Sequence, residues 1–447
     1  MDTSTPIIDL GDKRLNNRFS QIVNQFMKKP TASIPQACGI WKNTKAAYRF
    51  FSNKSVDPEK ILKAHYSQTQ KRIDNTTGVV LVAQDTTDCD YSTHYRTGGL
   101  GYLQGEKLFG IKMHSALAIS EKGVPLGLLA QKRWIRDIAE FGKRRMKGKE
   151  KRTMEEKESN RWLTTVRDIK VYIPKVRQVV VIGDRESDLY ELFAMQRPQN
   201  INLLVRAKHN RYLWGTDKRL FTKVLNEPPA GEYTIFVRRT VHRFLQKVKI
   251  GIHHTSVTLA SKNNRGAIRA WVVAAEEKEP PIGVKPIRWI LLTTVPVTTF
   301  EKAKEVIDWY AKRWLIERFH YTLKSGCKIE ELQLQEKTRL ERALATYSTV
   351  ALRLLFMTYE AREHPNESYR TIITDEEWEV LCAGTKSSKN TPETIYEAVR
   401  MIARLGGFLA RKHDGEPGVK TLWTGMIKLS YMMTGWYLLK EKGMHGK

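Results

Sequence analysis

The pattern of apolar and polar positions divides the chain into a helical beginning, a strand-rich middle and a helical end. Between Asp12 and Phe26 the apolar side chains recur at helical spacing, and Asp12 is placed to cap that helix. A second helical segment is expected at Thr44–Ser52, where basic residues such as Arg49 lie among apolar ones. Both helices therefore carry an apolar face and a basic face.

Short apolar runs rich in β-branched residues come next, and such runs predict buried strands. They lie at Val79–Ala83, Phe109–Ile119, Val124–Ala130, Val179–Ile182 and Leu203–Ala207. The first of these runs leads to Asp85 and the fourth to Asp184. We expect both strands to end at these aspartates, at the edge where open α/β sheets hold their sites. For either residue alone, an aspartate that caps a turn is the ordinary alternative.

The middle and the end of the chain differ in their periodicity. Over about residues 212–296, turn signals separate segments that predict a β-rich insertion with strands at Ile235–Val237, Val248–Ile252, Ser256–Leu259, Ala270–Ala275 and Trp289–Thr294. Helical spacing is found at Ser159–Ile169, Phe300–Lys324 and Arg339–Arg362, and from Thr391 to the C-terminus with a break at Gly406-Gly407. The pattern suggests domains at 1–62, 63–365 and 366–447.

The charge of the chain indicates a polyanionic partner. There are 76 Lys and Arg against 48 Asp and Glu, which leaves a net charge of +28. Nucleic acid and an anionic membrane surface are the two candidates, but no apolar run reaches the roughly 18 residues of a membrane span. The four cysteines are scattered without a CxxC pair, which argues against a zinc finger or a disulfide framework. We expect an intracellular nucleic-acid-binding protein, with residues 1–62 as a helical DNA-binding domain.

One helical segment carries an unusual set of side chains. Over Asp308–Glu330, a continuous helix with 100° per residue would bring four polar residues within about 60° of one another. They are Tyr310, Arg313, Glu317 and Lys324. An Arg–Glu pair four residues apart is commonly a surface ion pair, but that explanation does not account for a Tyr and a Lys in the same stripe.

Glu317 adds a third carboxylate to Asp85 and Asp184. Three carboxylates can hold two Mg²⁺ ions, because this hard cation prefers oxygen ligands. Two such ions can clamp the attacking and leaving oxygens of an in-line phosphoryl displacement. The neighbouring basic and phenolic groups would fix the phosphodiester.

The spacing Tyr-x2-Arg-x3-Glu-x6-Lys matches the YREK signature of DDE transposases of the insertion-sequence-four family. The whole chain resembles the transposon Tn-five type of these enzymes. The similarity follows the chain in order over nearly its full length. It includes the segments GDKRLNNR, AAYRFF, QDTTDCDY, GDRESDLY, LVRAKHNR, RWILLTTVPV and ARLGGF.

The resemblance implies an α/β fold: an RNase H-like catalytic core with a β-strand insertion, flanked by an N-terminal helical DNA-binding domain and a C-terminal helical dimerisation domain. It implies that Asp85, Asp184 and Glu317 are the catalytic triad and bind two Mg²⁺ ions, for which Mn²⁺ can substitute. DNA contacts are expected from Tyr310, Arg313, Lys324, Trp289, Trp314, Arg206, Lys208, Arg211 and Arg49. His114, His209 and His320 match no zinc pattern and are interpreted as polar neighbours of the site.

The activity implied by the resemblance is cut-and-paste transposition of double-stranded DNA. Water nicks one strand at the transposon end, the freed 3′-OH attacks the opposite strand to form a hairpin, water reopens the hairpin, and the 3′-OH attacks target DNA. A base flipped out at the hairpin would stack on Trp289, with Trp314 taking part; core packing is the ordinary alternative for a Trp. A homodimer in a synaptic complex is implied, joined through helices around Ile395–Phe408 and Leu422–Leu439, in the bacterial cytoplasm or nucleoid.

Two other functions remain open from the sequence. One is a non-catalytic DNA-binding regulator of transposition, and the other is a general RNase H-like DNA nuclease. The chain also departs from the family in a shorter region before the C-terminus and in a rich basic run at Lys143–Arg152. These departures leave the target-DNA and dimer contacts open.

Overall fold

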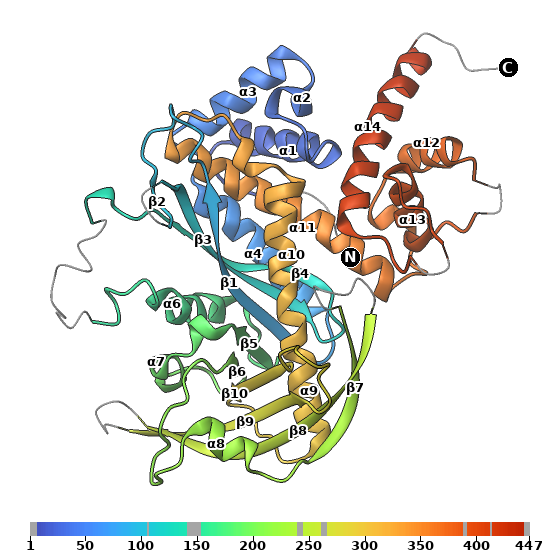
Figure 1. Cartoon of the computed structure of the whole chain (residues 1–447). Helices are drawn as coiled ribbons and strands as arrows, with labels where there is room; N and C mark the ends of the chain where they lie inside the picture. Colours follow the sequence, from blue (N-terminus) through green and yellow to red (C-terminus); the bar gives the residue numbers. More distant parts are fainter. Residues whose placement is uncertain are drawn as a thin grey trace. The chain divides into compact units, whose positions relative to one another are not determined.

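The computed structural model of the chain describes residues 7–104, 107–140, 153–238, 245–260, 266–387, 391–411 and 414–441. The basic run at Lys143–Arg152, for which we expect an exposed loop, lies outside the described residues. The chain forms two compact units. The first comprises Met1–Thr76, Thr86–Glu150 and Ile316–Lys447, and the second comprises Thr77–Asp85 and Lys151–Leu315. Elements of both are labelled in Figure 1. The three domains expected from the sequence stay a prediction.

The first unit begins with the predicted basic helix. Helix α1 (Lys13–Lys28) starts at Asp12, whose carboxylate accepts a hydrogen bond of 2.7 Å from the Arg14 backbone N–H. This bond satisfies one of the free amides at the helix start. Helices α2 (Ile34–Cys38), α3 (Trp41–Ser52) and α4 (Pro58–Asp74) follow. The predicted segments at Asp12–Phe26 and Thr44–Ser52 are thus confirmed, whereas α4 was missed.

A long helix and a small sheet form the centre of the first unit. Strands β2 (Gly101–Tyr102), β3 (Phe109–Ser120) and the distal part of β1 (Val80–Asp90) are arranged as β2-β3-β1, with β4 (Pro125–Trp134) antiparallel to β3. Helix α11 (Lys337–Glu363) packs on α4 and β4 (Figure 1). Most of its residues are buried. Helix α12 (Asp375–Thr385), which the pattern did not predict, forms a separate apolar core with α13 (Ile395–Leu405) and α14 (Val419–Glu441).

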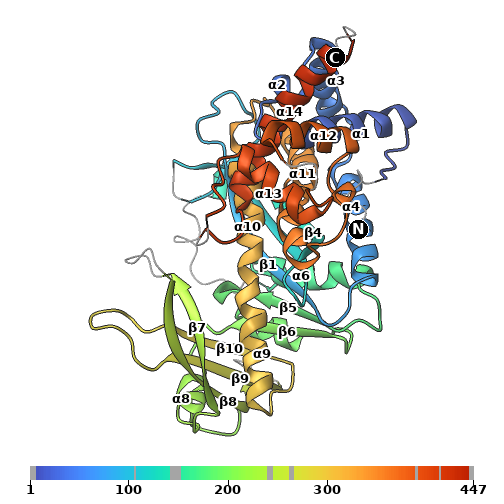
Figure 2. The same cartoon turned by 90° about the vertical axis from the view of Figure 1, so that its right-hand side faces the viewer.

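The second unit contains a mixed sheet. Strand β1 is parallel to β5 (Val179–Gly183), and β5 is parallel to β6 (Ile201–Arg206). Antiparallel strands continue the sheet, in the order β10 (Arg288–Thr293), β9 (Ala267–Glu277), β8 (Leu245–Ala260) and β7 (Gly231–Arg238). Helix α9 (Phe300–Ala311) lies against β8 and β9 (Figure 2). The described residues of this unit also form the short helices α6 (Asn160–Ile169), α7 (Tyr190–Ala194) and α8 (Leu220–Leu225).

The α/β fold with helical ends is confirmed, but three details of the prediction were wrong. Strand β1 does not end at Asp85 and continues to Asp90. The strands expected at Val248–Ile252 and Ser256–Leu259 are one strand, because β9 pairs with β8 without interruption. The helix expected at Phe300–Lys324 is interrupted by a 3₁₀ turn at Lys312–Trp314 and a π turn at Thr322–Gly326, on either side of α10 (Leu315–Tyr321).

These interruptions change the expected stripe of polar residues. A 3₁₀ turn advances about 120° per residue instead of 100°. Tyr310 and Lys324 are therefore not on one face of a single regular helix with Arg313 and Glu317 between them.

Candidate active site

Two aspartates lie side by side on neighbouring strands of the second unit. Strands β1 and β5 pair in parallel, and the last paired positions are Ala83 and Ile182. Asp85 and Asp184 each follow two residues later, so that the register places them abreast. Both side chains are half-buried. Of the two strand ends expected at these aspartates, only that of β5 is found, because β1 continues to Asp90.

The electrostatics of Asp184 suit a cation-binding role. Burial raises the pKa of its carboxyl group above the ordinary value, and the nearby Asp85 carboxylate acts in the same direction. A hydrogen bond of 2.8 Å from the Glu186 backbone N–H and the positive charge of Arg313 lower the pKa but do not cancel the rise. A pair of partly buried carboxylate groups that repel each other offers hard oxygen ligands, which fits Mg²⁺ or Mn²⁺.

An aromatic and basic cluster lies in the same unit. The Arg313 guanidinium carbon is 5.9 Å from the centre of the Tyr310 ring, and the Trp289 ring meets that ring edge-on at 5.3 Å. Arg206 donates a hydrogen bond of 3.2 Å to the backbone carbonyl of Arg288, next to Trp289. Burial raises the pKa of Tyr310, opposed by Arg313 and Arg206, so that the phenol is a neutral hydrogen-bond donor at ordinary pH.

Charge interactions connect this cluster with the aspartates. The carboxylate of Asp184 raises the pKa of Tyr310, and the positive charge of Arg313 lowers the pKa of Asp184. The structure thus brings together six of the residues predicted for the site. They are Asp85, Asp184, Arg206, Trp289, Tyr310 and Arg313.

Glu317 and Lys324 belong to the first unit. Glu317 is exposed on α10, two residues after the last residue of the second unit. The ammonium group of Lys324 donates a hydrogen bond of 2.8 Å to the Asp88 backbone carbonyl and pairs with Glu330 at 2.9 Å. Catalytic and DNA-binding roles for these two residues stay a prediction.

A buried ion pair orders the segment after β6, and the sequence pattern did not reveal it. Asp188 accepts hydrogen bonds from the backbone N–H groups of Lys208 at 2.7 Å and His209 at 3.0 Å, and it forms an ion pair with Arg211. The Asp188 side chain is fully buried. Arg211 therefore neutralises a carboxylate of the protein, and a phosphate contact from this residue stays a prediction. The sequence pointed to Asp188 only in that this residue lies in GDRESDLY, one of the segments that resemble the transposase family.

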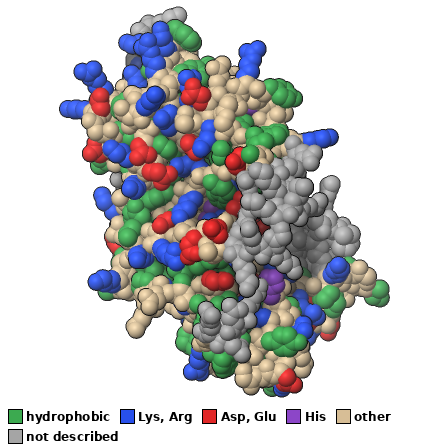
Figure 3. All heavy atoms as spheres, turned by 90° about the vertical axis from the view of Figure 1, so that its left-hand side faces the viewer, with side chains coloured by type: hydrophobic (Ala, Val, Ile, Leu, Met, Phe, Trp, Pro, Cys, Tyr) green, Lys and Arg blue, Asp and Glu red, His purple; other side chains and the backbone are tan. Residues whose placement is uncertain are grey.

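Other predicted DNA-contacting side chains reach the solvent. Trp314 is 45% exposed, and Arg49 on α3 and Lys208 after β6 are exposed. Figure 3 shows Lys and Arg side chains dispersed among acidic and hydrophobic ones on the face that it draws. His114, by contrast, is buried and its Nδ1 atom is 2.8 Å from the Thr86 hydroxyl.

Three family models match consecutive parts of the chain. A transposase DNA-binding model matches residues 3–56, a transposase DDE domain model matches residues 143–353, and a transposase Tn5 dimerisation domain model matches residues 350–441. The chain belongs to the Tn5-type DDE transposases. The transposase is thus an enzyme that acts on DNA, and its C-terminal helices belong to a dimerisation domain.

The family models also bear on the site. Asp184 and Glu317 lie within the range matched by the DDE domain, whereas Asp85 precedes it. DDE transposase domains use divalent metal ions, in agreement with the donor set at the aspartate pair. Among the described residues of the transposase, no helix is both long and apolar enough to cross a membrane.

Proposed function

We propose that this transposase cuts and pastes DNA through a hairpin intermediate and that Asp85, Asp184 and Glu317 form its catalytic, metal-binding triad. The observation that carries the proposal is the parallel register of the two aspartates, with the raised pKa of Asp184 beside Arg313 and Tyr310. Two Mg²⁺ ions, or Mn²⁺ in their place, would supply Lewis-acid activation and charge neutralisation at the scissile phosphate.

The basic and aromatic residues of the cluster have separate roles in this proposal. The guanidinium groups of Arg313 and Arg206 hold non-bridging phosphate oxygens, and the Tyr310 hydroxyl donates a further hydrogen bond. Lys324 acts as an additional positive charge near the DNA strand. Since each step is a displacement at phosphorus, one site can serve nicking, hairpin formation, hairpin opening and strand transfer in turn.

DNA binding before chemistry is assigned to other parts of the chain. Arg49 on α3 contacts the backbone of the transposon end, and Lys208 and Arg211 contact phosphates near the site. Two protomers then join two ends in a synaptic complex through the C-terminal domain. We assign this work to the bacterial cytoplasm or nucleoid. Because phosphate contacts dominate the affinity, end binding should weaken steeply as salt rises.

A strand-transfer assay tests the proposed function. The purified full chain is incubated with double-stranded DNA that carries a transposon end and with a separate target plasmid, with and without Mg²⁺. Hairpin ends and covalent joining of the 3′-OH to the plasmid, both dependent on Mg²⁺, are the expected results. Cutting without joining would indicate a general nuclease, and binding without cutting would indicate a regulator; either outcome would contradict the proposal.

The Trp289→Ala variant should slow hairpin formation more than nicking. Trp289 packs edge-on against Tyr310 and is half-buried, so that part of its surface is available to a flipped base. Loss of one base–aromatic stack, worth about 1–3 kcal/mol, corresponds to a decrease of about 5- to 150-fold in the hairpin rate. Denaturing gels of end-labelled DNA separate the nicked and hairpin products over time.

Trp289→Phe is the matched control for that variant, because it keeps an aromatic face in the same strand position. It should retain most of the hairpin rate. Equal slowing of nicking and hairpin formation in Trp289→Ala would show that Trp289 only supports the packing of Tyr310.

A further inference from the structure

The C-terminal end of helix α11 brings together three metal-ligating side chains that the proposed chemistry does not use. Glu360 and His364 are four residues apart, a spacing that puts them on the same side of a helix. The helix ends at Glu363, and a turn follows in which the Glu367 N–H donates to the His364 carbonyl at 3.1 Å. This turn brings the third side chain back, so that one ligand atom from each of Glu360, His364 and Glu367 lies within 4.8 Å of the others.

Glu360 is the buried member of this cluster, and its charge is incompletely matched. Its side chain is 1% exposed, and Oε1 is 3.0 Å from Nδ1 of His364. The second oxygen, Oε2, is buried and has no hydrogen-bond partner among the described residues. Burial raises the pKa of this carboxyl group, and the positive charges of a protonated His364 and of the amino terminus do not cancel the rise, to which Glu367 contributes. A buried oxygen without a partner is costly, and a cation beside it would remove that cost.

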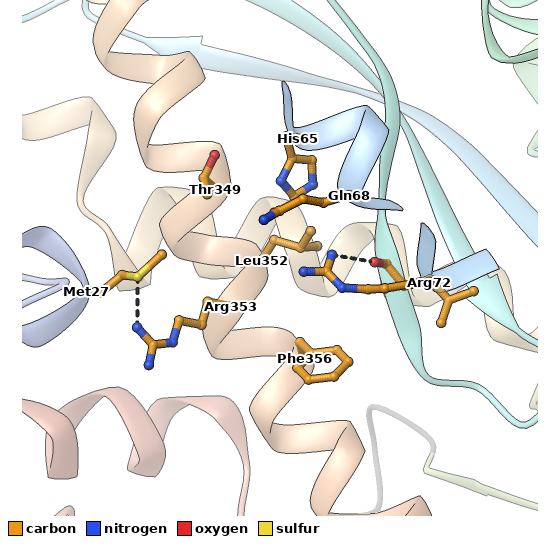
Figure 4. Close-up of a pocket in the computed structure, with 9 residues that line it drawn as sticks. Met27, His65, Gln68, Arg72, Thr349, Leu352, Arg353 and Phe356 are labelled. Carbon is orange, nitrogen blue, oxygen red and sulfur yellow. Dashed lines mark hydrogen bonds between the residues drawn. The ribbon is translucent and has the colours of Figure 1, made fainter. Parts of the chain in front are cut away.

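Another charge on α11 shows what Glu360 lacks. Arg353, about two turns earlier, donates to the Met27 sulfur at 2.9 Å (Figure 4) and to the Ile372 carbonyl at 3.0 Å. The Glu377 carboxylate also raises its pKa, as a counter-charge does. Within the part of the chain that the structure describes, Glu360 forms an ion pair with His364 alone. The end of the helix adds partial negative charge of its own, which favours a cation at this position.

The mixture of ligand atoms indicates the class of ion. Mg²⁺ prefers oxygen ligands, whereas one imidazole nitrogen with two carboxylate groups suits Zn²⁺ and related transition-metal ions. Ligand atoms that share one Zn²⁺ ion lie roughly 3–3.5 Å apart, and the 3.0 Å between Glu360 and His364 agrees with this spacing. The Glu367 side chain is exposed and that of His364 is 39% exposed, so that both can rotate to close the remaining distance.

We propose that Glu360, His364 and Glu367 bind one divalent transition-metal ion, such as Zn²⁺, with water completing its coordination. The ion stabilises the fold and takes no part in DNA cleavage. The turn that carries the ligands is attached to the start of α13, where the Ile395 N–H donates to the Glu367 carbonyl at 2.7 Å. Both segments lie in the range matched by the dimerisation model, and α11 and α13 share the apolar core of that region. A bound ion would therefore hold the end of α11 on this core.

Thermal unfolding of the full chain, prepared without a histidine tag, tests this proposal. The protein is freed of metal with a chelator, the chelator is removed, and melting temperatures are measured with and without a small excess of Zn²⁺. For the wild type we expect Zn²⁺ to raise the melting temperature by about 2–4 °C. Glu367→Ala and His364→Ala should lose most of this rise. Because Glu367 is exposed, its removal should leave the metal-free protein close to the wild-type melting temperature.

Glu363→Ala is the matched control. It removes a carboxylate from the last residue of α11, but Glu363 does not belong to the cluster. This variant should keep the wild-type response to Zn²⁺. All three variants retain Asp85, Asp184 and Glu317, so that any Zn²⁺ bound by those residues acts equally on every protein and cancels in the comparison.

Crystals of the wild-type protein grown with Zn²⁺ provide the direct observation. An anomalous peak at the zinc absorption edge is expected about 2.0–2.2 Å from ligand atoms of Glu360, His364 and Glu367. Absence of that peak would overturn the proposal and would show that Glu360 and His364 form only an ion pair at the helix end. The same conclusion would follow if Glu367→Ala and His364→Ala kept the full response to Zn²⁺.

Discussion

Replacing Glu317 by Ala should reduce strand cleavage on the order of 10³-fold or more and leave binding to the transposon end largely intact. Glu317 is an exposed side chain of the short helix α10, so that its removal leaves no cavity and exposes no core. If it completes the metal-binding triad, its loss removes a ligand that holds charge at the scissile phosphate. Cleavage of end-labelled DNA in Mg²⁺ and a gel-shift measurement of end binding test the two halves of this prediction.

The control for Glu317→Ala is Glu301→Ala. Glu301 is also an exposed glutamate, in the first turn of α9, and it has no proposed part in the chemistry. It should cleave at close to the wild-type rate. If Glu317→Ala nicks DNA at the rate of this control, Glu317 is not a member of the triad. If Glu317→Ala loses end binding to the same extent as cleavage, the residue contributes to DNA affinity instead.

How much of the fold could be predicted depended on how local the determining interactions were. Asp12 begins α1 because its own carboxylate caps the next amides, which a sequence shows directly. The end of a strand is different, because it depends on the partner strands. Strand β1 pairs with β5 only as far as Ala83, but it continues to Asp90, and its last residues belong to the first unit. No local feature of the sequence marks this change of pairing. The breaks at Lys312–Trp314 and from Thr322 were missed because the residues up to Lys324 keep the spacing of a regular helix.

The candidate site was predictable in its residues and less so in its contacts. An apolar run followed by Asp is a local pattern that selects Asp85 and Asp184 from the sequence, whereas their placement side by side depends on the pairing of β1 with β5. The pairing of Asp188 with Arg211 joins residues 23 positions apart, on segments whose distance is set only by the folded sheet. The edge-on contact between Trp289 and Tyr310 likewise depends on how α9 lies over its neighbouring strands.

The Asp184→Asn variant should lose cleavage by on the order of 10³-fold or more and at the same time raise the stability of the metal-free protein. Because the pKa of Asp184 is raised in the folded state, ionisation of this group is easier in the unfolded chain. The stability that the protonated form contributes is complete below the ordinary pKa of Asp and is lost as pH rises through the raised pKa of the folded state. At neutral pH the ionised Asp184 carboxylate therefore destabilises the folded protein, whereas a neutral amide at this position does not.

Thermal unfolding at pH 7 without divalent ions should show Asp184→Asn to be more stable than wild type, by at most about 1 kcal/mol given its partial exposure. Below about pH 4 the two proteins should converge, because Asp184 is then protonated. Adding Mg²⁺ should stabilise the wild type and not the variant, so that the difference in stability between them disappears or changes sign. A variant that is less stable than wild type in metal-free buffer would contradict the interpretation of the aspartate pair as a like-charge site that awaits a cation.

The matched control is Asp188→Asn, which changes an aspartate four residues away to the same amide. Asp188 is fully buried and paired with Arg211, and it accepts two backbone hydrogen bonds. Its neutralisation leaves a guanidinium without its counter-charge and should destabilise the protein by about 3–5 kcal/mol, with or without Mg²⁺. The two variants should thus shift the melting temperature in opposite directions. This contrast distinguishes Asp184, which repels Asp85 until a metal binds, from Asp188, which stabilises the fold. A shift of the melting temperature in the same direction for both variants would show that Asp184, too, serves mainly to stabilise the segment after its strand.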